Sequence, residues 1–442
     1  MTNDSGLFPP RWKWEEKGYR SDEYGNWLLG NWQPYTGPNN ILKRPRGLIV
    51  SPNGAAAVHL EDVEDVALPL YQGVMIHKFD FAYKELVNSK GRKWTATPWS
   101  EKRIVPQYLM SRSDFSQHGS LRASYRVGFR GVARTTDQST LISAVVPVLP
   151  CADKVPFLIT RNPVEQLILA GTLNSTVDDW VQRQRQSGAT LNFFLLEDLP
   201  LIPFEQIPRT RLAEINAQLS WCAPRFGGSW LELRSTTNVR VPRWALMRHE
   251  RLRLRAITEA ITGFLLGLDQ LDVAHILADC DHPPERLAIK QFSRSLDPKG
   301  FWRIEKDQPP EHRLGVLSQI AFIDLSNKGL AAFCSQNDGE GWMLPETLRL
   351  ADFGLGHDDR SKEHQPVAAA LGPRFYPWQL EHSVEESWEE CERHAEVLAK
   401  LLPPPDTNAA MSVGSDAPID LFGNPVATDL FGDAVYARSR KR

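Results

Sequence analysis

The hydrophobic pattern of this chain changes near residue 205, and this change constrains the fold more than any other feature. Before it, apolar residues alternate with polar ones or gather in short β-branched runs between turns rich in Gly, Pro and Asn. After it, apolar residues recur every three or four positions, which predicts amphipathic helices over 209–221, 248–280, 312–325 and 383–402. The chain is therefore expected to have an α+β fold, with a mixed-strand part followed by a mainly helical part.

The first part predicts a definite succession of elements. Residues 58–73 predict a short strand and a turn, and residues 124–134 alternate as a half-buried strand does. Residues 140–150 form a continuous apolar run, which is typical of a strand covered on both faces. Residues 162–188 have helical periodicity and end in a glycine that suits a helix C-cap, and residues 190–203 predict a further strand.

Composition narrows the class of protein. The chain has 442 residues, 42% hydrophobic and 24% charged, which is ordinary for a globular protein and predicts two or three domains. No apolar run reaches the length of a membrane span, and the N-terminus has no apolar signal core. Five scattered cysteines form no CxxC pair, so a zinc ribbon or thioredoxin-type site is not expected and the thiols should stay reduced. A cytoplasmic protein without a membrane partner is expected.

Residues 87–135 form a basic zone in a chain whose net charge is only −3. The zone holds ten basic residues and two acidic ones. Local excess of positive charge is the electrostatic footprint expected of a DNA-binding surface. The candidate DNA-binding residues are Lys90, Arg92, Lys93, Lys102, Arg103, Arg122, Arg126, Arg130 and Arg134.

The last four of these arginines recur every fourth residue. In a strand they would share one face at intervals of roughly 13 Å, so they could follow a phosphate backbone or reach base edges. Arginine suits both contacts because its planar fork binds phosphate or guanine in a bidentate manner. The alternative is a solvent-facing strand that carries ordinary surface charges.

Catalytic motifs are not found in the sequence. Neither an Asn/Asp-Pro-Pro-aromatic loop nor a GxGxxG or GxxxxGK[ST] loop is present. The acidic run at 61–65 is interpreted as a solvated turn, and the cluster Cys280, Asp281 and His282 as a helix end rather than a metal site. No catalytic residue and no metal ligand is therefore assigned.

Five segments resemble, in the right order, the region that follows the catalytic domain in large adenine-specific DNA methyltransferases. Such enzymes occur in single-chain restriction–modification enzymes and in phage-defence systems such as BREX and DISARM. The segments are LPLYQGVMIHKFD (68–80), YRVGFRGVARTTDQSTLISAVVPVLP (125–150), LILAGTLNSTVDDWVQRQRQSGATLNFFLLEDLPLIP (167–203), RLRAITEAITGFLLGLDQLDVAHIL (253–277) and GFWRIEKDQPPEHR (300–313). The resemblance covers about residues 40–325. Phe81 departs from the family's usual His, and Thr258-Glu259 departs from its usual Asp-Ala.

The resemblance implies a DNA sequence-recognition (specificity) subunit, or C-terminal half, of a split adenine-specific DNA methyltransferase in a prokaryotic restriction–modification or phage-defence system. Only about 40 residues precede the matching region, whereas the family's catalytic half stands there. Methyl transfer is therefore expected of a separate catalytic subunit that binds S-adenosylmethionine, and this chain is expected to bind no cofactor itself. The expected ranges are an entry region (1–86), a target-recognition domain (87–205), a helical domain (206–402) and a flexible tail (403–442).

Two segments are predicted to dock partner proteins. In the family, the loop that holds Tyr71, Gly73, Met75 and Phe79 leaves the catalytic domain, so these residues are candidates for docking the catalytic partner, with Gly73 at a turn of positive φ. A buried linker without a partner is the alternative. The tail repeats IDLFGNPVA and TDLFGDAVY. Its docking candidates are Leu421, Phe422, Leu430 and Phe431.

The tail repeat leaves several functions open. Asp-Leu-Phe resembles the peptides that bind bacterial sliding clamps, although both copies lack the usual Gln; docking on this chain or on another protein is the alternative. A non-catalytic scaffold that bridges defence proteins is the alternative function. A cryptic enzyme and a fragment of an interrupted gene remain open as well.

Overall fold

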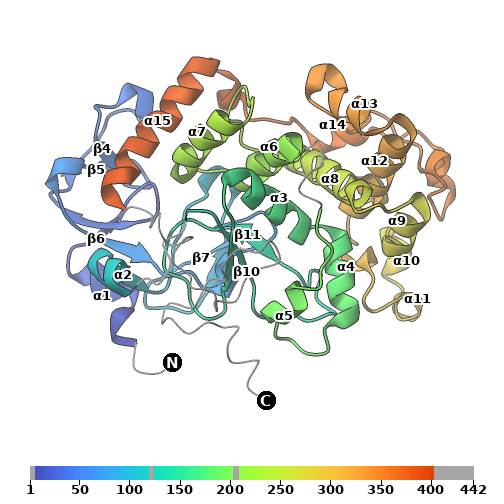
Figure 1. The fold of residues 1–442 in the computed structure, drawn as a ribbon, viewed down its shortest axis with the longest axis horizontal. Helices are drawn as coiled ribbons and strands as arrows, with labels where there is room; N and C mark the ends of the chain where they lie inside the picture. The colour runs from blue at the N-terminus through green and yellow to red at the C-terminus, as the bar shows by residue number, and fades with distance from the viewer. Residues whose placement is uncertain (1–4, 119–123, 203–208, 403–442) are drawn as a thin grey trace.

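The computed structural model describes residues 5–118, 124–202 and 209–402. Antiparallel sheets occupy residues 20–159 and helices dominate the rest, so the α+β prediction is confirmed. In Figure 1 the strands lie at the left and centre, and the helical part runs from α15 at the upper left across the top to α9, α10 and α11 at the right. Within the described ranges, no helix is both long and apolar enough to cross a membrane.

The first sheet has the order β1-β2-β6-β9, formed by Arg20–Ser21, Trp27–Gly30, Val63–Pro69 and Leu109–Ser111. β6 is a strand followed by the single turn of helix η4 (Gly73–Met75), which confirms the strand and turn predicted over 58–73. A smaller sheet, β3-β5-β4, joins Gln33–Pro34, Ala56–His59 and Leu48–Val50. The short helices α1 (Arg11–Glu16) and α2 (Arg112–His118) flank the strands.

The second sheet places β10 (Arg126–Phe129) between β11 (Ser143–Val145) and β12 (Phe157–Ile159). Both predicted strands of this region are thus present. All four residues of β10 are buried, so the strand is covered on both faces and not half-exposed as its alternation predicts. A separate hairpin pairs β7 (Lys84–Leu86) with β8 (Trp94–Ala96).

The single helix predicted over 162–188 is two helices, α3 (Pro163–Leu173) and α4 (Thr176–Arg185). The side chain of Ser175 accepts a hydrogen bond from the backbone N–H of Asp178 and so begins a new helix, as N-caps do. α4 ends before Gln186, two residues ahead of the predicted glycine cap. The strand predicted over 190–203 is wrong: α5 (Phe193–Leu196) forms there, because a short buried apolar run suits either element.

The helical part confirms the four predicted segments. α6 (Arg209–Ser220), α12 (Leu314–Lys328) and α15 (Val384–Leu401) match three of them. The fourth is divided into α8 (Arg248–Leu265) and α9 (Gln270–Ile276) by Gly267, whose φ is 81°. The remaining α-helices in the described part of this region are α7 (Gly227–Thr236), α10 (Pro284–Leu287), α11 (Lys290–Ser293), α13 (Leu330–Ser335) and α14 (Val367–Leu371).

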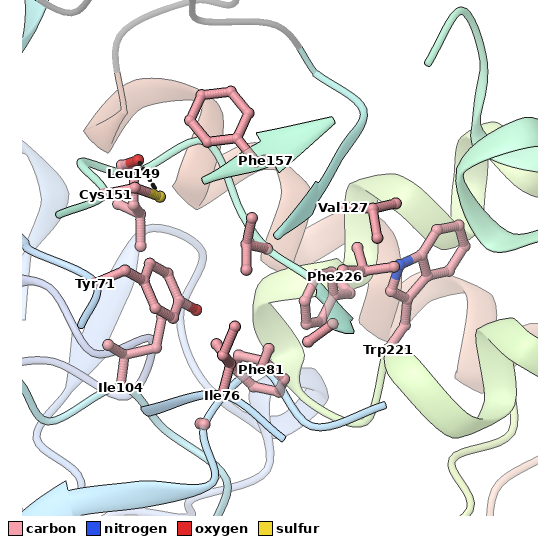
Figure 2. Close-up of a cluster of buried hydrophobic side chains, with 14 of the residues drawn as sticks. Tyr71, Ile76, Phe81, Ile104, Val127, Leu149, Cys151, Phe157, Trp221 and Phe226 are labelled. Atoms are coloured by element: carbon pink, nitrogen blue, oxygen red, sulfur yellow. Dashed lines mark hydrogen bonds between the residues drawn. The ribbon is translucent and has the colours of Figure 1, made fainter. Parts of the chain in front are cut away.

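One hydrophobic core contains side chains of both the strands and the helices, and a second core lies mainly among α6, α8 and α12. Figure 2 shows Phe81 of the N-terminal part beside Phe226 of the helical part, and their ring centroids lie 4.9 Å apart in an edge-to-face arrangement. The indole of Trp221 extends this cluster. α15 returns to the N-terminal strands (Figure 1), where the hydroxyl of Tyr24 and Nδ1 of His394 are 2.9 Å apart. The predicted domain boundaries at residues 86 and 205 stay predictions.

Candidate nucleic-acid interface

A pocket of about 550 Å³ opens where the turn after β6, the hairpin and the end of β10 meet. Six of its lining residues come from the segment 68–85, in which glycine and charged residues interrupt an apolar run. Its lining residues are Gln72, Gly73, Val74, His77, Tyr83, Lys84, Arg130, Val132, Ala152, Asp153 and Lys154.

Arg130 is the most rigidly held cation of the pocket. Its Nε donates a hydrogen bond to the carbonyl oxygen of Gly73, and its Nη2 donates to that of Ile76, both at 2.8 Å. Among the described residues Nη1 has no acceptor, so its hydrogens remain for a ligand. Burial lowers the pKa of Arg130, but a guanidinium starts so high that it stays charged at neutral pH.

The rings of Tyr83 and His77 lie against each other, and both line the pocket. Their centroids are 4.5 Å apart, and their planes are tilted by 38°. Burial, reinforced by the positive charge of Arg130, lowers the pKa of His77 to about 3, so the imidazole is neutral at physiological pH. The guanidinium of Arg130 lies 6.0 Å from the centroid of Tyr83, and the ammonium of Lys84 lies 5.2 Å from it.

The positive charge continues from the pocket along the β7–β8 hairpin. Lys84 begins β7, and the loop at the other end of the hairpin carries Lys90, Arg92 and Lys93, all exposed. Within the described ranges, Arg92 and Lys93 have no ion-pair partner, whereas Lys90 is 3.1 Å from Glu16 in an exposed pair of the kind that contributes little. Pocket and hairpin together are called the basic strip below.

The outward ladder of arginines predicted from their spacing is wrong. Arg126 is 1% exposed, and its guanidinium lies 4.5 Å from the ring of Phe157 and donates to the carbonyl oxygen of Leu149. Burial lowers its pKa to about 10. Because β10 ends at Phe129, Arg130 and Arg134 lie beyond the strand; Arg134 is exposed in the following turn.

Lys102 also lies inside the protein rather than on a DNA-facing surface. Its ammonium is 2.6 Å from a carboxylate oxygen of Asp80 and donates to the carbonyl oxygen of Ala82. Arg103 is partly buried and paired with Glu85 at 3.4 Å. Arg122 lies outside the described residues. Of the nine predicted DNA-binding residues, the basic strip therefore brings together Lys90, Arg92, Lys93 and Arg130.

The predicted docking loop is part of the core. Tyr71, Met75 and Phe79 are all buried within this chain, so a role in docking a catalytic partner is corrected (Figure 2 shows Tyr71). The positive φ expected of Gly73 occurs instead at Phe79, where φ is 57°. Gly73 matters for space, since a Cβ there would lie 3.2 Å from the carbonyl oxygen of Lys154. Leu421, Phe422, Leu430 and Phe431 lie outside the described residues.

The two histidines near Cys280 pair with neighbouring aspartates. Nε2 of His282 lies 3.1 Å from Asp279, and Nδ1 of His357 lies 3.1 Å from Asp281. Across residues 5–118, 124–202 and 209–402, no group of three or more His, Cys, Asp or Glu side chains could hold a metal ion.

Of the lining residues, the set predicted from the sequence holds only Gly73 and Arg130; Tyr83, Lys84 and Lys154 are among those that it lacks. Lys84 precedes the basic zone by three residues, and its place at the base of a hairpin follows only from the pairing of Lys84 with Ala96. Lys154 comes from the segment after β11 and reaches the pocket through the tertiary fold. Its 3.2 Å pair with Asp153 is exposed on both sides and therefore weak.

Comparisons with models of known protein families, with curated proteins and with solved structures find no match for this chain.

Proposed function

We propose that this chain is the DNA sequence-recognition subunit of a split adenine-specific DNA methyltransferase in a prokaryotic restriction–modification or phage-defence system. The observation that carries the proposal is the basic strip, in which a fixed guanidinium, a pocket and a hairpin with exposed cations adjoin one another. A separate catalytic subunit would bind S-adenosylmethionine and transfer the methyl group.

The dimensions of the strip suit a phosphate backbone. β7 runs from Lys84 to Leu86, and three residues of extended chain span about 10 Å. A DNA strand presents a phosphate about every 3.4 Å along the helix axis, and a strip of this length can reach more than one phosphate. Contacts of this kind supply affinity and register, while base-edge contacts would supply specificity.

The order of the family-like segments supports the choice of partner. The segment at 68–80 forms one side of the pocket, and the segment at 125–150 supplies Arg130 and Val132 on another side. Two segments that resemble the family thus meet at the basic strip. This agreement favours a DNA-recognition role over a scaffold that ignores DNA.

The DNA-binding part is tested by the salt dependence of binding to a short labelled duplex, measured by fluorescence anisotropy. The double substitution Arg92→Ala/Lys93→Ala should weaken binding and reduce the slope of log K against log salt by about 2, since each lost phosphate contact removes about 0.9. The matched control is Arg349→Ala/Lys362→Ala, which removes two exposed charges that pair with Asp352 and Asp359 in the helical part. An unchanged slope in the hairpin variant would contradict the assignment of the interface.

The split-enzyme part is tested by native mass spectrometry of the tagged chain purified from its own host. A stoichiometric partner that carries an Asn-Pro-Pro-aromatic methyltransferase motif is expected. Recovery of a folded chain without such a partner would reject the split enzyme and leave an independent DNA-binding protein.

A further inference from the structure

We infer that the pocket of the basic strip receives a single nucleotide whose base has left the stack of the DNA. This inference rests on the proposed function and names the part of the DNA that the pocket takes. It follows from the volume of the pocket, its aromatic lining and its fixed cation.

The volume of the pocket favours a whole nucleotide over a lone phosphate as its ligand. At about 550 Å³ the pocket falls within the range of sites that enclose a small organic molecule. A phosphate of intact duplex needs only an exposed cation, which the hairpin loop already provides with Arg92 and Lys93. The pocket therefore has room for a base and a sugar in addition to a phosphate.

The aromatic surface suits a base. Tyr83 and His77 present rings 4.5 Å apart, and the apolar side chain of Val132 is 46% exposed at the same pocket. Bases stack on aromatic side chains in proteins that bind unpaired strands, because every base has a flat π-face. A base inside a duplex is covered by its neighbours above and below and does not offer this face.

The cation suits the phosphate that accompanies the base. Arg130 is held by two backbone carbonyl oxygens, so its side chain is oriented before any ligand arrives. Its Nη1, which has no acceptor among the described residues, can donate a charge-assisted hydrogen bond to a phosphate oxygen, and Lys84 adds positive charge to the pocket. The neutral imidazole of His77 can meet the base as a hydrogen-bond donor or acceptor without the cost of burying a further charge.

The same chemistry would accept a free mononucleotide, so the experiment has two arms. In the first, the full chain is titrated with a short duplex that contains one unpaired 2-aminopurine nucleotide, and with the same duplex fully paired. The unpaired nucleotide should raise affinity about tenfold or more, and 2-aminopurine fluorescence should fall on stacking. In the second arm, AMP is titrated alone by calorimetry and is expected to bind far more weakly than the bulged duplex.

Two substitutions test the pocket itself. Tyr83→Leu removes the flat ring and keeps bulk, and Val132→Trp fills the pocket from an exposed position where the fold is little disturbed. Each should bring the ratio of bulged to paired affinity close to one. Arg349→Ala/Lys362→Ala should keep the wild-type ratio.

The outcomes separate this inference from the proposed function. If the wild type bound bulged and paired duplex equally, or if its preference for the bulge survived both substitutions, the inference that the pocket takes a nucleotide would be wrong. Salt-dependent binding of the duplex would still support the proposed DNA-recognition role. Saturable, Tyr83-dependent binding of AMP without a preference for the bulged duplex would show that the pocket takes a free nucleotide. The inference that it takes a nucleotide of DNA would then be wrong. Absence of any salt-dependent duplex binding would overturn the proposed function as well.

Discussion

His77 combines two roles at the residue scale, because it lines the pocket and is also a partly buried titratable group. Its ring lies against Tyr83, and its neighbours Arg130 and Lys78 carry positive charge. Burial and these cations together disfavour the imidazolium, so the folded protein holds His77 neutral where an unfolded chain would protonate it. The residue therefore links the stability of the fold to pH.

Replacement of His77 by Gln should make unfolding less sensitive to pH. The folded pKa of about 3 lies below the ordinary value of 6.5, so the unfolded state binds more protons between these values and stability falls as pH falls through this window. Between pH 6.5 and pH 5 the wild type should lose about 2 kcal/mol through this group, a loss that His77→Gln lacks. Urea unfolding at both pH values measures the difference, and parallel pH dependence in the two proteins would refute it.

Spacing predicted which arginines share a parity but not which way they point. Arg126 and Arg130 are four residues apart, yet one is enclosed beneath Phe157 and the other reaches the pocket. A long side chain whose charge meets carbonyl oxygens can be buried, and those oxygens come from Leu149, Gly73 and Ile76, which are distant in sequence. Only the tertiary structure brings these partners together.

At the scale of elements, the break between α3 and α4 shows what periodicity leaves undetermined. The side-chain amide of Asn174 accepts a hydrogen bond from the backbone N–H of Ser143 and donates one to its carbonyl oxygen, both at 3.0 Å. The helix ends where this side chain binds β11, and Ser175 then caps the next helix. Apolar stripes predicted the existence of the helical segments, and polar contacts with a distant strand decide where they end.

Replacement of Asn174 by Ala should destabilise the fold by about 2–3 kcal/mol, because it leaves the buried N–H of Ser143 without its acceptor. Ser383→Ala is the matched control, since it removes only an exposed N-cap of α15 and should cost about 1 kcal/mol. Urea midpoints of both variants measure the costs. An Asn174 variant no less stable than the Ser383 variant would mean that the junction with β11 is unimportant.

At the scale of the whole molecule, the sequence predicted the fold class and the order of strands and helices. It predicted few of the residues that line the pocket. The switch from strands to helices follows from local periodicity, which each segment carries in itself. The pocket depends on segments around residues 72, 84, 130 and 154, and Gly73 and Lys154 approach so closely that a Cβ at Gly73 would lie 3.2 Å from the carbonyl oxygen of Lys154. No local pattern encodes that meeting, because each segment is positioned by the shared core.

That shared core predicts that the strand part and the helical part unfold together. Phe81 packs edge-to-face on Phe226 between them (Figure 2), so Phe81→Ala should cost about 3–5 kcal/mol through lost burial and the cavity that remains. Phe264→Ala, at a side chain 37% exposed on α8, is the control and should cost far less. Tryptophan fluorescence, with Trp221 stacked on Phe226, and far-ultraviolet circular dichroism should report one coincident transition in all three proteins. Two separated transitions in the wild type would show that the parts are independent units, and the pocket would then owe nothing to the helices.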